Sequence, residues 1–133
     1  MGLNLIKEYS NKLQVTNAKT IFEEMVDIKD TNKEHFIIFH LDTRNNIILR
    51  EIIGIGVLNV CCVDCRTVFR SAISNNCNSI IISHNHPSGD VSPSFEDKSI
   101  TKKLIKAGDI LGIKLLDHVI VGKNDYKSII DEV

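Results

Sequence analysis

The sequence predicts an α/β fold, a mixed β-sheet flanked by helices, in a single domain that spans residues 1–133. Of the 133 residues, 43% are hydrophobic and 25% charged, which is enough apolar material for one sizeable core. Isoleucine-rich apolar runs, typical of buried strands, alternate with segments of helical spacing. This alternation is what a sheet with helices packed on it requires.

The first half of the chain predicts a helix and then a β-hairpin, after an N-terminal extension over residues 1–15. Thr16 stands where a helix N-cap is expected. Ile21, Met25 and Ile28 follow it at helical spacing and should face inward. Two apolar runs separated by turn-forming residues then indicate a hairpin. The expected helix, strand, turn and strand cover residues 16–28, 36–41, 42–46 and 47–55.

The second half of the chain alternates helices and strands. The first of its strands is short and apolar enough to be central in the sheet. The Pro-Ser-Gly-Asp sequence at 87–90 has strong turn chemistry, and Gly108 is expected to end the longer helix. The expected helices and strands, in chain order, are 66–74, 79–83, 95–107 and 115–121.

Charge and hydropathy narrow the class of protein. The formal net charge is −1 and the isoelectric point about 6.5, whereas proteins that grip nucleic-acid phosphates usually carry a basic excess. No apolar run approaches the roughly 20 residues of a membrane helix. Residues 1–10 lack the apolar stretch of a signal peptide. We therefore expect a cytoplasmic protein with no membrane partner.

The chain has four cysteines, Cys61, Cys62, Cys65 and Cys77. Three of them are clustered and no export signal is visible, so reduced thiols are expected. Cys62-x-x-Cys65 has the spacing of half a zinc or redox site, but no second pair with zinc-ribbon spacing exists. We favour small buried or surface thiols.

The segment after the central strand contains the residues suited to chemistry. His84 and His86 are two apart at the end of an apolar run, and strand side chains alternate between faces. Both imidazoles should therefore point to one side and form half of a zinc site. Asp97, in the first turn of the next expected helix, is the candidate third ligand, with water as the fourth.

Each part of this pattern has an ordinary structural explanation. A lone His-x-His pair often binds no metal. Ser94-x-x-Asp97, taken alone, resembles a capping box at a helix N-terminus. The combination is more specific than its parts, but spacing alone leaves both interpretations open.

Glu51 adds to the pattern. In an extended strand it shares a face with apolar residues, and a carboxylate in an apolar stripe is costly unless it has a partner or a function. Burial would raise its pKa towards that of a general acid or base. The alternatives are an exposed face or a partner lysine or arginine.

Taken together, these residues resemble the JAMM (MPN-type) metalloprotease motif, with an upstream glutamate in Glu51. More narrowly, the chain resembles the RadC family of bacterial JAMM-domain proteins, from about Thr16 to the C-terminus. The segments that carry this resemblance are 51–59, 68–70, 84–90, 93–94 and 115–118.

The resemblance implies a JAB/MPN-like three-layer sandwich around a curved sheet, and a role for each site residue. His84, His86 and Asp97 would bind Zn²⁺ and a water molecule. Glu51 would hydrogen-bond that water and move its proton, and Ser94 would stabilise an oxyanion. These roles suit zinc chemistry, because zinc lowers the pKa of the water and polarises a carbonyl.

The sequence also departs from the family. Many members have Val-His-Pro-Arg-Glu where this chain has Val-Asp-Cys-Arg-Thr at 63–67. Longer members carry a helix-hairpin-helix module of a DNA-binding type, for which we expect no room here. His118, in the 115–118 match, is either an outer partner of the metal site or a core histidine bonded to the backbone.

The sequence is compatible with three functions. The first is a zinc-dependent peptidase or isopeptidase-like hydrolase acting on a protein or peptide. The second is a DNA-repair-associated protein that binds nucleic acid or cleaves phosphodiesters, as the RadC name suggests. The third is an inactive partner-binding module. The complete set of site residues favours the first, and neither the substrate nor the oligomeric state follows from the sequence.

Overall fold

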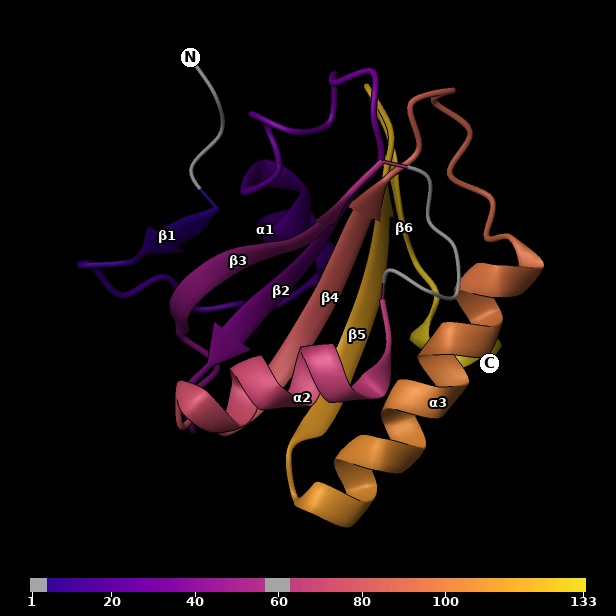
Figure 1. Ribbon diagram of the computed structural model, residues 1–133. Coiled ribbons are helices and arrows are strands. Elements are labelled where there is room, and N and C mark those ends of the chain that lie inside the picture. Colours follow the sequence, from indigo (N-terminus) through magenta and orange to yellow (C-terminus); the bar gives the residue numbers. More distant parts are fainter. Residues whose placement is uncertain (1–4, 57–62) are drawn as a thin grey trace.

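The isoleucine-rich runs form one mixed sheet in the computed structural model, which describes residues 5–56 and 63–133 (Figure 1). Its six described strands follow the order β1-β3-β2-β4-β5-β6. β4 and β5 run parallel, and the other neighbouring pairs are antiparallel. The strands are β1 (Ile6–Glu8), β2 (His35–Leu41), β3 (Ile47–Ile55), β4 (Ser79–Asn85), β5 (Lys114–Val121) and β6 (Tyr126–Ser128).

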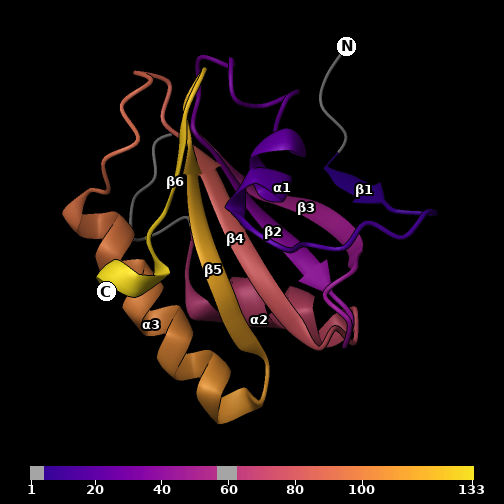
Figure 2. The ribbon, with the colours of Figure 1, turned by 180° about the vertical axis from the view of Figure 1, so that it is seen from behind.

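Helices cover both faces of this sheet, which makes a three-layer sandwich. α2 and α3 lie on one face (Figure 1), and α1 lies on the opposite face (Figure 2). This arrangement confirms the predicted α/β fold with a mixed sheet. The helices are α1 (Ala18–Glu23), α2 (Cys65–Ser74) and α3 (Phe95–Leu111), and a 3-10 turn covers Ile130–Glu132.

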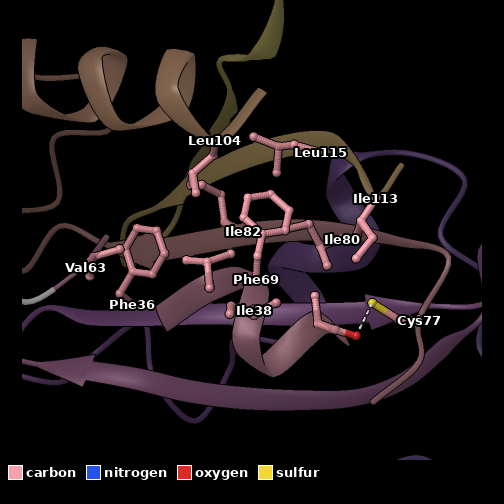
Figure 3. Packing of buried hydrophobic residues seen from close by; sticks show 12 residues of the cluster. Phe36, Ile38, Val63, Phe69, Cys77, Ile80, Ile82, Leu104, Ile113 and Leu115 are labelled. Atoms are coloured by element: carbon pink, nitrogen blue, oxygen red, sulfur yellow. Dashed lines mark hydrogen bonds between the residues drawn. The ribbon is translucent and has the colours of Figure 1, made fainter. Parts of the chain in front are cut away.

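Strand alternation creates a separate apolar core on each face of the sheet. Beneath α2 and α3, alternate residues of β2 and β4 such as Ile38 and Ile82 pack against Phe69 and Leu104 (Figure 3). Beneath α1, the intervening strand residues pack against the helix and the turns that follow it. The predicted inward residues Ile21, Met25 and Ile28 are fully buried there.

The face beneath α1 also holds an ion pair between a buried arginine and a partly exposed aspartate. Arg50 of β3, 2% exposed, donates two 2.8 Å hydrogen bonds to the carboxylate of Asp27 and one to the backbone oxygen of Glu24. Burial of a guanidinium is costly unless its donors are paired. The pair therefore fixes the turns after α1 against β3.

The boundaries of several elements differ from the predictions. β1 and β6 were not predicted, because each has three residues and little apolar character. α1 is capped by Asn17 rather than Thr16. α3 passes through Gly108 and ends at Leu111, followed by the C-cap residue Gly112, whose φ of 76° is left-handed. Gly108 serves packing instead, since a Cβ there would collide with the carbonyl oxygen of Ile113.

Candidate metal centre

His84, His86 and Asp97 converge at the end of β4. One ligand-type atom from each lies within 4.8 Å of the others. His84 Nε2 is 3.1 Å from Asp97 Oδ1, His86 Nε2 is 3.2 Å from Asp97 Oδ2, and the two Nε2 atoms are 2.9 Å apart. The three residues predicted as zinc ligands are thus brought together.

Strand alternation and helix capping position these side chains. His84 lies in β4 and His86 directly follows that strand, so both project towards the face covered by α2 and α3. Asp97 occupies the third position of α3 and belongs to a capping box. Ser94 Oγ accepts the backbone N–H of Asp97, and Asp97 Oδ2 accepts the backbone N–H of Ser94. The Asp97 carboxylate therefore both caps α3 and contacts the two histidines.

The loop between β4 and α3 is held by close backbone packing. His86 donates its backbone N–H to the carbonyl oxygen of Val121 at the end of β5. The Cα of Gly122 faces this loop so closely that an added Cβ would lie 2.7 Å from the carbonyl oxygen of Gly89. This contact fixes the path by which Asp97 returns to the histidines.

The electrostatics of the site keep Asp97 anionic between the two histidines. Burial alone would raise the pKa of Asp97, but hydrogen bonds from His84 and His86 outweigh it and lower that pKa well below its usual range. The hydrogen bond to Asp97 raises the pKa of His86. An anionic carboxylate between two imidazole nitrogens is a donor set suited to a divalent cation such as zinc. The side chain of His86 is 14% exposed whereas that of His84 is fully buried, so solvent reaches the site beside His86.

The sequence that forms this sheet and site matches a known family. A family model described as RadC-like JAB domain matches residues 14–133. The chain belongs to the RadC-like JAB domain family.

Curated relatives of this RadC-like JAB domain carry the name UPF0758 protein. One from Chlorobaculum tepidum is 49% identical over 120 residues, covering 90% of this chain and 54% of that protein. One from Chlorobium chlorochromatii is 46% identical over 129 residues, covering 95% and 58%. One from Methanococcoides burtonii is 50% identical over 104 residues, covering 78% and 45%. The chain thus spans about half the length of the relatives it matches.

Glu51, predicted as the acid/base, lies on the face of the His84 side chain but at a distance. Its cross-strand neighbour Ile38 pairs with Ile82, not with His84. Two interstrand spacings and two residues along a strand correspond to about 12 Å between the Cα atoms of Glu51 and His84. The Glu51 carboxylate accepts a 2.7 Å hydrogen bond from Ser71 of α2.

Glu34 stands closer to the metal ligands, and sequence reasoning placed it in a polar connector. Continuing the register in which Phe36 pairs with His84 past the ends of β2 and β4 puts Glu34 level with His86 and on the same face. The charge of Glu34 contributes, after the bonds to Asp97 and the Asp90 backbone, to the raised pKa of His86. The sequence signal for Glu34 was its position two residues before Phe36, which puts both side chains on one face of an extended segment. That signal points to the metal ligands only once β2 is known to neighbour β4.

Asn85, between the two histidines, holds the backbone on both sides of Glu34. Its Oδ1 accepts the backbone N–H of His35 at 2.7 Å, and its Nδ2 donates to the carbonyl oxygen of Lys33 at 3.0 Å. The fully buried Asn85 therefore ties the start of β2 to the metal-ligand segment. Sequence reasoning did not identify this residue.

The remaining predicted residues of the RadC-like JAB domain are also located. His118 of β5 is fully buried against His84, so of the two alternatives for this residue the geometry favours an outer partner. Cys65 and Cys77 are free thiols, and Cys62 lies outside the described residues. No helix in the described ranges combines the length and apolar character needed to cross a membrane.

Proposed function

We propose that this RadC-like JAB domain is a zinc-dependent hydrolase that cleaves amide bonds of a protein or peptide. The observation that carries the proposal is the convergence of His84, His86 and Asp97 within 4.8 Å, on a site that solvent reaches beside His86. Two nitrogens and one carboxylate oxygen match the ligand set of catalytic zinc sites, which leave a fourth position for water or substrate.

When bound, zinc would supply an acidic water molecule and a Lewis acid for the carbonyl. The protein's part is to hold the ligands and to handle protons. His84 and Asp97 are buried, so they keep their positions while substrate approaches past His86.

We assign the acid/base role to Glu34 rather than Glu51. The register of β2 and β4, continued past Phe36, puts Glu34 level with His86, and Asn85 fixes the backbone on both sides of Glu34. A carboxylate there could take a proton from water at the site and return it to the leaving amine. Glu51 is engaged with Ser71 about 12 Å away, outside hydrogen-bonding reach of such a water.

Ser94 is proposed to stabilise the oxyanion. Its Oγ accepts the backbone N–H of Asp97, so the hydroxyl hydrogen remains available for donation. Ser94 is exposed beside the ligand Asp97, where a substrate carbonyl could meet it. A hydrogen bond that strengthens as charge develops on oxygen contributes to transition-state stabilisation.

A protein or peptide substrate suits this site better than nucleic acid. The formal net charge of −1 offers no general attraction for phosphates. The cytoplasmic location expected from the sequence would make intracellular proteins the targets. The nucleic-acid alternative is tested by a binding titration with a DNA oligonucleotide, in which a salt-dependent affinity would support it.

Metal content and paired glutamate variants test the proposal. We expect about one zinc per chain by mass spectrometry, lost in the His84→Ala/His86→Ala double variant. Against a proven peptide or isopeptide substrate, Glu34→Gln should lower kcat at least 100-fold with zinc retained. Glu51→Gln is the matched control and should stay within about tenfold of the parent. A parent without zinc, even after reconstitution, would exclude the function, and the reverse order of the two glutamine variants would return the acid/base role to Glu51.

A further inference from the structure

A chain of buried polar groups runs behind the ligand His84 from β4 through β5 to α3. His84 Nδ1 lies 2.8 Å from His118 Nε2, and His118 Nδ1 lies 2.6 Å from Thr101 Oγ1. Thr101 Oγ1 lies 2.6 Å from the backbone carbonyl oxygen of Asp97. His84, His118 and Thr101 are fully buried, so no solvent competes for these contacts.

The backbone carbonyl of Asp97, at the end of this hydrogen-bond network, fixes which atom donates at each step. A carbonyl oxygen can only accept, so the single hydroxyl hydrogen of Thr101 is donated to Asp97. Thr101 Oγ1 must then accept from His118 Nδ1–H, which leaves a lone pair on His118 Nε2. That lone pair accepts from His84 Nδ1–H, so Nε2 is the nitrogen of His84 that remains to bind a metal, which would take the place of any hydrogen it donates to Asp97. This is the nitrogen that faces Asp97 and His86.

We propose that Thr101 and His118 are positioning residues that set His84 in the tautomer able to bind metal through Nε2. This inference rests on the proposed zinc site and extends it to residues that touch neither metal nor substrate. The same hydrogen-bond network connects the backbone of Asp97 to the ring of His84 through Thr101 and His118. Two ligands from different elements, β4 and α3, are thereby oriented by one network.

His86, the second proposed histidine ligand, is set in the same tautomer by one direct hydrogen bond. His86 Nδ1 lies 2.7 Å from the carbonyl oxygen of Asp90, which can only accept. His86 therefore carries hydrogen on Nδ1, and its Nε2 faces the site. His84 has no carbonyl oxygen within reach of Nδ1 among the described contacts, and the relay through His118 takes that place.

The tautomers are measured directly on the metal-free protein. Long-range ¹H–¹⁵N spectra of the imidazole rings, recorded after chelation and with assignment by His→Gln variants, distinguish protonated from unprotonated nitrogens. We expect hydrogen on Nδ1 of both His84 and His118 in the parent. In Thr101→Val, the preference of His118 for Nδ1–H should be lost. An unprotonated Nδ1 on His84 in the metal-free parent would mean that the hydrogen bonds run in the opposite direction and would overturn the proposal.

Zinc affinity provides the second measurement. Competition with a chromophoric chelator should show 10- to 100-fold weaker zinc binding in Thr101→Val and in His118→Phe, about the effect of removing an outer partner of a metal ligand. Thr101→Ser keeps the hydroxyl and should remain within about threefold of the parent. Ser83→Ala is the matched control, because Ser83 is equally buried on β4 and bonds Val119 of β5 without joining the relay.

The possible outcomes separate this inference from the proposed function. A parent that binds no zinc overturns both. A parent that binds zinc, with Thr101→Val and His118→Phe binding it equally well, overturns the relay alone. An equal loss of affinity in Ser83→Ala would assign the effect to general weakening of the β4–β5 pair, and would also overturn it.

Discussion

Ser94 donates its backbone N–H to Asp97 Oδ2 over 2.8 Å, and the same oxygen lies 3.2 Å from Nε2 of His86. Helix capping and the proposed metal ligation, the two interpretations that the sequence left open, therefore do not exclude each other, because one oxygen both caps α3 and faces a histidine of the candidate site. The capping box fixes the carboxylate in the absence of metal, which is the arrangement expected of a preorganised ligand.

Substitution at Asp97 should separate these two roles. Asp97→Asn keeps a side-chain oxygen that can accept from Ser94, but it removes the charge that the histidines face. We expect zinc affinity to fall at least 100-fold, while the metal-free protein loses less free energy of unfolding than Asp97→Ala. The alanine variant also removes the capping bond and should cost about 1 kcal/mol more. Zinc competition and thermal unfolding after chelation measure the two effects, and equal stability of both variants would argue against the capping role.

Asn85→Ala should affect catalysis more than metal binding. The substitution leaves the His35 N–H and the Lys33 carbonyl oxygen without their buried partner, so the segment that carries Glu34 is no longer fixed. A displacement of about 1 Å in a catalytic group can cost 100-fold in rate. We expect kcat to fall at least tenfold, with zinc affinity within about threefold of the parent.

The control for Asn85→Ala is Asn75→Ala, which removes a side-chain bond to the Ser71 backbone at the end of α2. Its kcat should match that of the parent. If Asn85→Ala keeps full turnover, Asn85 does not position the acid/base, and the assignment of Glu34 loses its main structural support.

Gly122→Ala should weaken zinc binding from outside the ligand set. The new Cβ would lie 2.7 Å from the Gly89 carbonyl oxygen and 3.2 Å from Val91, so the loop that leads to Asp97 must move. We expect zinc affinity to fall about tenfold or more. Gly54→Ala is the matched control, because its Cβ would make ordinary contacts of 3.6 Å or longer. Unchanged zinc affinity in Gly122→Ala would show that the loop adjusts freely.

The ion pair of Asp27 and Arg50 predicts a dependence of stability on pH. Hydrogen bonding to Arg50 lowers the pKa of Asp27. The carboxylate therefore contributes stability above its unfolded pKa of about 3.9, and this contribution is lost as the pH falls through the lower folded pKa. Asp27→Asn should cost about 1–2 kcal/mol at pH 7, a value reduced for the partial exposure of Asp27.

The measurement is the free energy of unfolding of both proteins between pH 2 and pH 7. The gap between them should be constant above about pH 5 and shrink as Asp27 is protonated. Glu23→Gln, an exposed substitution in α1, controls for a change in net charge. A gap that does not depend on pH would mean that packing of the side chain, rather than its charge, stabilises α1 and β3.

The fold could be predicted from sequence where periodicity is strong. The burial of Ile21, Met25 and Ile28 and the four longest strands were expected because burial forces apolar residues into regular spacing, although α1 ends at Glu23 and the last two of these residues lie in the turns after it. The short edge strands β1 and β6 carry no such pattern, and they exist because β3 and β5 offer them hydrogen bonds. Gly108 was misassigned because a glycine required for close packing has the same sequence signal as one that ends a helix.

The candidate metal site was predictable to the extent that its residues are close in sequence. His84, His86, Ser94 and Asp97 fall within one short segment, so strand alternation and a capping pattern sufficed to group them. Glu34 and Thr101 could not be found this way. Each joins the site through a neighbouring strand or a turn of α3, and such neighbours are determined by the order of strands in the sheet.

In the proposed mechanism, the residues for metal ligation and for proton transfer come from separate parts of the chain. The proposed ligands and their relay belong to the continuous unit β4-α3-β5, whereas Glu34 is the residue before β2 and meets that unit through strand pairing and the side chain of Asn85. A change at the start of β2 would therefore convert a hydrolase into a metal-loaded but inert protein in one step. In lineages of this domain, loss of turnover should precede loss of the metal, and inactive descendants should still be recognisable by their zinc content.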